Sequence, residues 1–144
     1  MKKIIFLLSI SITLLFASNS SDELKLKILK NIISGIENSK PMTVWSDDEE
    51  IMSAFYLSKK FVVVDRYEDA KMIILSKKSN LPKRRRGKHI FVLDYNLLYE
   101  IPESIGAFFW KKGRPNIVFL KSRIEEQSLK LSANLKPYLE EKLW

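Results

Sequence analysis

Apolar residues are spaced three or four positions apart between Leu24 and Ile36, and lysines fill many of the positions between them. This spacing places the apolar side chains on one face of an amphipathic helix, with the lysines outside. Ser20 and Glu23 have the spacing of a capping box at its start, and Pro41 prevents its continuation. The pattern therefore predicts a helix that opens the folded part of the chain.

Four short apolar runs follow, and each is separated from the next by a polar segment. They have the length of strands, and they lie at 42–45, 61–64, 72–75 and 90–93. The last three are apolar throughout, which is typical of strands covered on both faces of a sheet. We also expect a helix over 47–58, begun by a capping box at Ser46 and Glu49, and a short helix or turn over 96–104.

The last third of the chain predicts a hairpin and then a helix. Two apolar runs, 107–110 and 116–120, flank a link in which Gly113 supplies the positive φ of a tight turn. A third capping box begins at Ser122, and the helix that it opens is interrupted and restarts at Ser132. Together the elements predict an α/β fold: a three-layer Rossmann-like domain with a mostly parallel sheet, a C-terminal antiparallel hairpin and a terminal helix.

The first 17 residues have the three parts of a secretory signal peptide. Lys2 and Lys3 precede an apolar stretch over 4–16, and small polar residues follow Ala17, after which we expect cleavage. The apolar stretch is shorter than the roughly 20 residues that span a bilayer, so an uncleaved anchor is the less favoured alternative. We expect residues 18–144 to form one periplasmic domain.

Composition limits the partners that such an exported domain can bind. The chain has no cysteine, so it contains no disulfide and no cysteine-linked lipid anchor. Its formal net charge is +8. A basic protein favours anionic partners, and export argues against nucleic acid. The candidate partners are then anionic lipid head groups, cell-wall polymers or an acidic protein face.

Polar residues follow four of the predicted strands, at the edge where ligands bind in open parallel sheets. They are candidates for binding a small ligand, and they are Ser46, Asp65, Ser76 and Asp94. The same residue types cap helices and stabilise turns, which is the simpler interpretation of their positions.

No group of residues names a reaction. His89 is the only histidine, so no catalytic triad can be argued, and no glycine-rich phosphate loop occurs. The acidic run over 47–50 suits a helix start better than a metal site, because its side chains point in different directions. We therefore expect a non-catalytic protein and predict no catalytic residue, metal or cofactor.

The most unusual stretch, 83–88, is here called the basic loop. It contains five cations, and they are Lys83, Arg84, Arg85, Arg86 and Lys88. Such a cluster can bind an acidic partner face or an anionic membrane surface, where each cation contributes about 1 kcal/mol. The alternative is a solvated loop that keeps the protein soluble.

A second cationic group surrounds the predicted hairpin turn. It consists of Lys111, Lys112 and Arg114, and Trp110 precedes it. An exposed tryptophan beside cations would suit a partner anchor, although packing in the core is the more common role for a strand tryptophan. We include these four residues in a candidate partner or membrane contact.

Two segments near the end of the chain have a distinctive pattern. The first is a Gly-led hairpin that begins with Ser104 to Phe109, and the second is an L-x-L-S-x-x-L segment from Leu129 through Ser132 to Leu135. Over residues 104–136 the chain resembles the YfiR-like family of small periplasmic proteins. The resemblance implies a Rossmann-like three-layer fold and a regulatory role. Such proteins bind the periplasmic part of an inner-membrane signalling protein, typically a diguanylate cyclase, and hold it inactive, and members can form homodimers.

The resemblance transfers no site residue, and the lack of cysteine excludes disulfide control in this chain. We expect a periplasmic regulatory or binding protein that acts on an inner-membrane signalling protein. The alternative is a periplasmic protein that binds a small ligand at the strand ends.

Overall fold

The computed structural model describes residues 21–37, 41–59 and 61–143. Its strands are, in chain order, β1 Ile36–Glu37, β2 Thr43–Ser46, β3 Val62–Val63, β4 Met72–Leu75, β5 His89–Val92, β6 Ser104–Lys111, β7 Arg114–Leu120, β8 Lys130–Leu131 and β9 Leu139–Glu140. The N-terminal helix is described over 21–34, and it is followed by α2 Glu49–Tyr56, α3 Leu97–Glu100 and α4 Lys121–Glu126. Three 3-10 turns are η1 Tyr67–Asp69, η2 Lys78–Asn80 and η3 Lys136–Tyr138.

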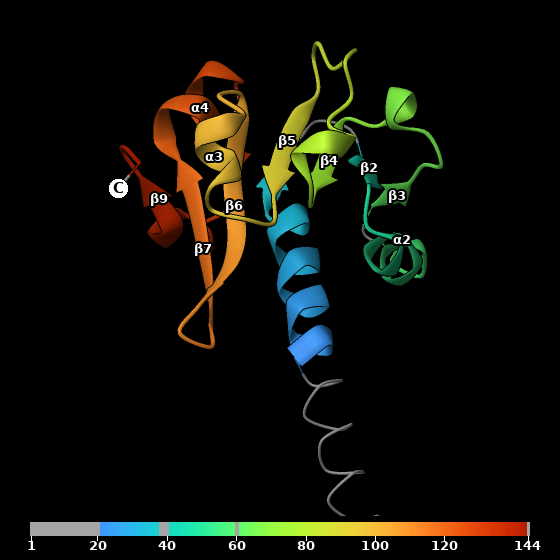
Figure 1. The fold of residues 1–144 in the computed structure, drawn as a ribbon, viewed down its shortest axis with the longest axis horizontal. Coiled ribbons are helices and arrows are strands. Elements are labelled where there is room, and N and C mark those ends of the chain that lie inside the picture. Colours follow the sequence, from blue (N-terminus) through green and yellow to red (C-terminus); the bar gives the residue numbers. More distant parts are fainter. Residues whose placement is uncertain (1–20, 38–40, 60, 144) are drawn as a thin grey trace, which may run out of the picture.

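A seven-stranded sheet with the order β3-β2-β4-β5-β6-β7-β9 forms the centre of the molecule (Figure 1). Neighbours from β3 to β6 are parallel, and β6 and β7 form an antiparallel hairpin. β9 lies outside β7 and runs parallel to it, so the hairpin is not the sheet edge. The mixed α/β class and the mostly parallel sheet are confirmed, and the arrangement is consistent with a Rossmann-like fold.

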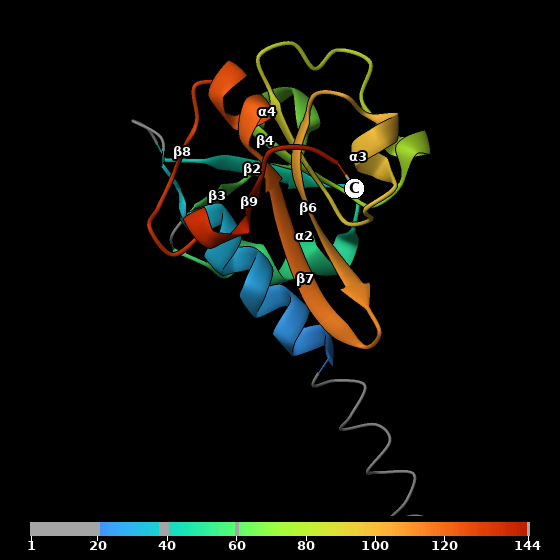
Figure 2. The same cartoon turned by 90° about the vertical axis from the view of Figure 1, so that its left-hand side faces the viewer.

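Each face of the sheet carries its own apolar core. On one face the N-terminal helix contributes Ile33 and α2 contributes Phe55, which share a cluster with Ile74. On the other face Leu98 of α3 shares a cluster with Ile73. Successive residues of β4 thus serve opposite cores, because side chains alternate along a strand. Figure 2 shows the N-terminal helix and α3 on opposite sides of the sheet.

An aspartate, and not the predicted serine, caps α2. Asp48 Oδ1 accepts from the amide nitrogens of Glu50 at 3.0 Å and Ile51 at 3.2 Å. The capping box predicted at Ser46 is wrong, because Ser46 is the last residue of β2 and its hydroxyl donates to the Ile74 carbonyl oxygen at 2.8 Å. A residue within a strand is too early in the chain to cap this helix.

β3 is shorter and more exposed than the apolar run at 61–64 predicts. Only Val62 and Val63 pair with β2, and β3 forms an edge of the sheet. Val62 is 51% exposed. The prediction that this strand is covered on both faces is wrong, because Val62 is exposed while Val63, on the opposite face, packs against the core.

The chain leaves α-helical conformation after α4 and does not resume it up to residue 143, the last that the structure describes. Ser128 has a φ of 55°, which turns the chain toward β8, and β8 pairs with β1. The helix predicted to restart at Ser132 is wrong, because η3, which contains Pro137, and β9 occupy that stretch. The predicted capping box at Ser122 is also wrong: α4 has Leu120 as its N-cap, with no side-chain cap bond.

The predicted signal peptide and the serine of the first capping box lie outside the described residues. Within the part that the structure describes, none of the helices combines the length and apolar character needed to cross a membrane.

Candidate functional site

Asp47 joins the ends of β2 and β4. Its carboxylate accepts from the Ser76 amide and the Ser76 hydroxyl, both at 2.8 Å, from the Lys77 amide at 3.1 Å and from the Asn80 side-chain amide at 2.9 Å. The Ser46 hydroxyl donates to a β4 carbonyl oxygen beside this network. Both serine hydroxyls predicted for ligand binding are therefore used within the protein.

The two other residues of the predicted ligand rim stand outside this network. Asp94 Oδ1 accepts from the Asn96 amide at 3.0 Å in the turn before α3, and Asp65 is exposed after β3. Two cavities, of about 390 and 340 Å³, are lined by none of the four rim residues. Ser46, Ser76 and Asp94 thus link strands or stabilise a turn, and ligand binding at this edge stays a prediction.

His89 is held in a structural contact. Its Nδ1 lies 2.7 Å from Gln127 Oε1, while Gln127 Nε2 donates to the Glu103 carbonyl oxygen at 2.7 Å. Because the amide nitrogen is committed to that carbonyl, the Gln127 oxygen faces the ring and His89 Nδ1 carries the donated proton. The pair fixes the start of β5 against α4 and the turn before β6, and it offers no nucleophile.

Arg85 holds the middle of the basic loop against the fold. Its guanidinium forms an ion pair with the Glu103 carboxylate, and its Nη1 donates to the Pro82 carbonyl oxygen at 2.9 Å. Burial opposes ionisation of Glu103, but the hydrogen bond and charge of Arg85, together with Arg123, lower the pKa of that carboxyl below its ordinary value. The ion pair is therefore intact at neutral pH.

Lys88 holds the end of the loop. Its Nζ donates to the carbonyl oxygens of Glu68 and Ala70, both at 2.7 Å. Gly87 has a φ of 79°, in the left-handed region, and the Lys88 amide closes the turn on the Arg85 carbonyl oxygen at 3.1 Å. The basic loop is therefore tied to the fold at two points, through Arg85 and Lys88.

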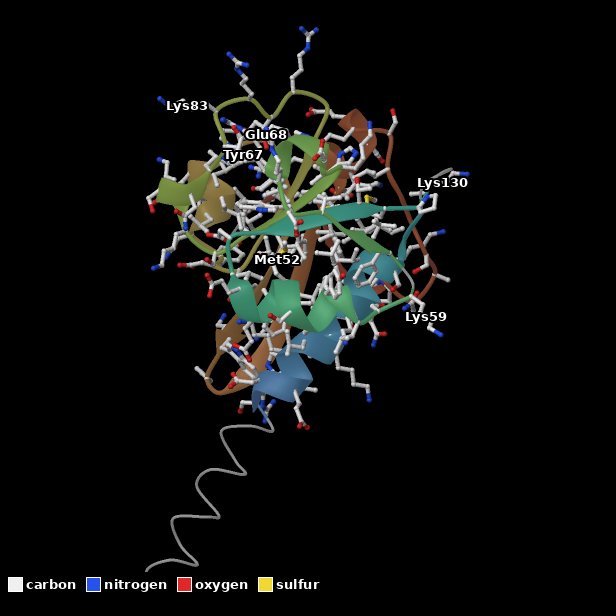
Figure 3. The ribbon with its side chains drawn as sticks, turned by 90° about the vertical axis from the view of Figure 1, so that its right-hand side faces the viewer. Met52, Lys59, Tyr67, Glu68, Lys83 and Lys130 are labelled. Carbon is white, nitrogen blue, oxygen red and sulfur yellow. The ribbon has the colours of Figure 1, made fainter. Side chains whose placement is uncertain are left out.

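Three cations of the loop remain exposed, and they are Lys83, Arg84 and Arg86. None of them forms an ion pair within the described residues. Figure 3 shows Lys83 at the same end of the molecule as Tyr67 and Glu68 of η1. The loop thus presents three charges from a fixed backbone.

The hairpin turn lies at the opposite end of the sheet. The basic loop precedes the first residue of β5, whereas the turn follows the last residue of β6, and β5 and β6 run parallel. Figure 1 shows the two at opposite ends, and the eight residues of β6 span about 26 Å. The cations of the loop and of the turn cannot form one surface, although the sequence suggests a single contact.

Lys112 and Gly113, at the centre of this turn, have φ values of 52° and 74°, so the predicted positive φ of Gly113 is confirmed. Trp110 is 43% exposed, and its ring stands edge-on to Phe108 with centroids 5.7 Å apart. Trp110 is therefore a surface residue whose ring packs against the buried Phe108.

Three side chains that hold the basic loop and its surroundings are not among the residues predicted for the site. Glu103 and Gln127 hold the loop and the start of β5, and Arg123 Nη1 donates to the carbonyl oxygens of Leu98 at 2.9 Å and Ser104 at 3.0 Å. Burial lowers the Arg123 pKa, which nearby carboxylates partly restore. No spacing in the sequence indicates these contacts, because each joins segments that are distant along the chain.

The sheet order and the two cores make this chain a mixed α/β protein with a mostly parallel sheet. Comparison of its sequence with known protein-family models and with curated proteins gives no match. The functional assignment therefore depends on the chemistry of the residues themselves.

Proposed function

We propose that this chain is a non-catalytic regulatory or binding protein that acts outside the cytoplasm on an inner-membrane signalling protein, of the diguanylate cyclase type by resemblance. The contact is the basic loop against an acidic face of the partner's exported part. The signal-peptide pattern of residues 1–17 and the resemblance of residues 104–136 support the compartment and the class of partner.

The observation that supports this contact is that two of the loop's five cations are bonded to the protein and three are exposed. Arg85 and Lys88 bind groups of the protein itself, whereas Lys83, Arg84 and Arg86 are exposed and form no ion pair with any described residue. A loop that is already ordered loses less conformational entropy when it binds than a flexible one does. Fixed cations also allow electrostatic complementarity to select one partner and to speed its association.

The experiment reverses charges at each end of the sheet separately. The variant Lys83→Glu, Arg84→Glu, Arg86→Glu keeps Arg85 and Lys88, so the loop stays anchored. The matched control is Lys111→Glu, Lys112→Glu, Arg114→Glu, which makes the same change of charge at the hairpin turn. Both are expressed as full chains in the native cell, each with a photo-crosslinking residue on the exposed loop, and cellular cyclic di-GMP is measured.

We expect the control to crosslink to one inner-membrane protein and to keep cyclic di-GMP low. The loop variant should lose the crosslink and raise cyclic di-GMP as deletion of the gene does. Undiminished crosslinking of the loop variant, or loss of the crosslink in the hairpin variant alone, would overturn the contact. Binding of the wild-type protein to vesicles with anionic lipid, without any protein crosslink, would assign the loop to the membrane instead.

A further inference from the structure

A cavity of about 390 Å³ lies between α4 and the segment that follows it. It exists because Ser128 turns the chain out of α4 and the pairing of β8 with β1 draws residues 130–131 away from the sheet. The chain then returns through η3 to pair β9 with β7. Three separated segments thus surround a space that no side chain fills. Its volume falls in the range of small-molecule sites, about 300–1,000 Å³.

The wall of this cavity is apolar. Ile124 of α4 and Leu131 of β8 are buried, at 5% and 7% exposure, and both belong to the core on that face of the sheet. Leu129 and Leu139 are half-buried and line the same space. These four side chains form a surface for an aliphatic body, because aliphatic side chains offer dispersion contacts and no hydrogen bond.

The rim of the cavity is cationic. Lys121, Lys130 and Lys136 line it from three different segments, with Glu125 as the one acidic residue among its lining residues. All three lysines are exposed, and none forms an ion pair with another described residue. Figure 3 shows Lys130 on the surface of the molecule, away from Lys83 and the basic loop. The lining residues thus carry a formal charge of 3 − 1 = +2, so the mouth of the cavity is positive.

We propose that this cavity binds a small amphipathic anion, a molecule with one aliphatic chain and one carboxylate or phosphate head group. The chain lies on Ile124, Leu131 and Leu139, and the head group sits among the lysine ammonium groups. Lysine suits this position because its aliphatic stem extends over the ligand chain while its ammonium group reaches the anion. None of the lining residues belongs to the basic loop, so this ligand binds at a site separate from the partner contact proposed above.

The test is calorimetric titration of residues 18–144, the chain expected after cleavage, with decanoate and decyl phosphate below their micellar concentrations. Decyltrimethylammonium has the same chain with the opposite charge, and acetate has the head group without the chain. We expect saturable binding of one decanoate or one decyl phosphate per chain. Decyltrimethylammonium and acetate should bind at least tenfold more weakly.

Two variants place the ligand in this cavity. Lys121→Gln, Lys130→Gln, Lys136→Gln should weaken binding of the anions at least tenfold, whereas Lys77→Gln, Lys78→Gln, Lys112→Gln, the same change on exposed lysines elsewhere, should leave it unchanged. Ala133→Trp adds an apolar ring at the cavity's exposed edge without changing its charge and should also weaken binding at least tenfold. Unchanged thermal unfolding midpoints verify that both variants are folded.

Equal binding of decanoate and decyltrimethylammonium would overturn the proposal, as would unaltered affinity in both cavity variants. Heat that depends on protein concentration in the absence of ligand and disappears in Ala133→Trp would assign the cavity to a second copy of the chain. Displacement of decanoate only by an acidic peptide that binds more tightly than either amphiphile would assign it to a protein segment. Both of these results also contradict the proposal.

Discussion

Asp47 and Ser76 lock the ends of two neighbouring parallel strands together, because the aspartate carboxylate accepts from both the amide and the hydroxyl of the serine at 2.8 Å. The same carboxylate also accepts from Lys77 and Asn80. It therefore organises the start of the long connection from β4 to β5, on which the basic loop lies. Because its carboxylate accepts from four donors, Asp47 is the residue that holds these strand ends together.

We predict that Asp47→Ala destabilises the protein by about 2 kcal/mol, because it removes charge-assisted hydrogen bonds at a partly buried position. Asp94→Ala removes the hydrogen bond from the Asn96 amide and should cost less than about 1 kcal/mol. Urea unfolding followed by circular dichroism measures both. Equal losses in the two variants would contradict the central role of Asp47.

Gly106 allows β6 and β7 to approach each other closely. A Cβ at this position would lie 2.4 Å from the Val118 carbonyl oxygen and 2.8 Å from Phe119 Cδ1. Gly106→Ala should therefore cost about 2–3 kcal/mol through overpacking. Gly113→Ala meets no atom within 4 Å and should cost about 1 kcal/mol through its positive φ alone. The unfolding free energies, measured in urea, should rank the variants in this order.

The Arg85–Glu103 ion pair makes the anchoring of the basic loop sensitive to acid. Because the folded state lowers the pKa of Glu103, its contribution to stability is present above the unfolded pKa, about 4.3, and is lost as pH falls through the folded value. Carboxyl NMR titration should give Glu103 a pKa below its ordinary range, and the Arg85→Gln variant should raise it. No rise in that variant would mean that another group stabilises the carboxylate.

The same pair predicts the dynamics of the loop. Glu103→Gln should accelerate amide hydrogen exchange in residues 83–88 several-fold at pH 7 while leaving the central strand β4 protected. At a pH below the folded pKa of Glu103, the wild-type protein and the variant should exchange at similar rates. A pH-independent difference between them would contradict an ionic origin of the anchoring.

Trp110 and Phe108 lie two positions apart on β6 but differ in burial, at 43% and 2% exposure. Phe108→Ala should cost about 3–5 kcal/mol, the usual range for a buried phenylalanine. Trp110→Ala should cost about 1 kcal/mol, since it loses mainly an edge-on aromatic contact. Guanidinium unfolding distinguishes the two. A large loss at Trp110 would mean that the hairpin end depends on it for its structure.

The central strands could be predicted from sequence because local composition decides them. The run at 72–75 coincides with β4, whose four residues are all buried, as an uninterrupted apolar run between parallel neighbours requires. For the run at 61–64 the sequence predicts a strand but not its position in the sheet. β-branched residues favour a strand at an edge as well as at the centre, so composition does not distinguish the two.

The terminal segment could not be predicted from its pattern. Leu131 and Leu135 have helical spacing and are both buried, yet β8 reaches its position by pairing with β1 near the other end of the chain. The cavity depends on the same pairing, so no local signal marks it. The sequence places Asp47 in the acidic run of a helix start, and its bonds to Ser76 and Asn80 require the strand order, which periodicity alone does not give.

One feature of α4 links the two surfaces of the protein. Arg123 of α4 and Gln127, which follows it, bond to the backbone of the turn around Glu103, and Glu103 in turn binds Arg85. Ile124 of α4 lines the cavity. The amphipathic anion and the protein partner would thus bind at surfaces that are both supported by α4. If the amphipathic anion changes the affinity for the protein partner by some factor, the partner must change the affinity for the anion by the same factor.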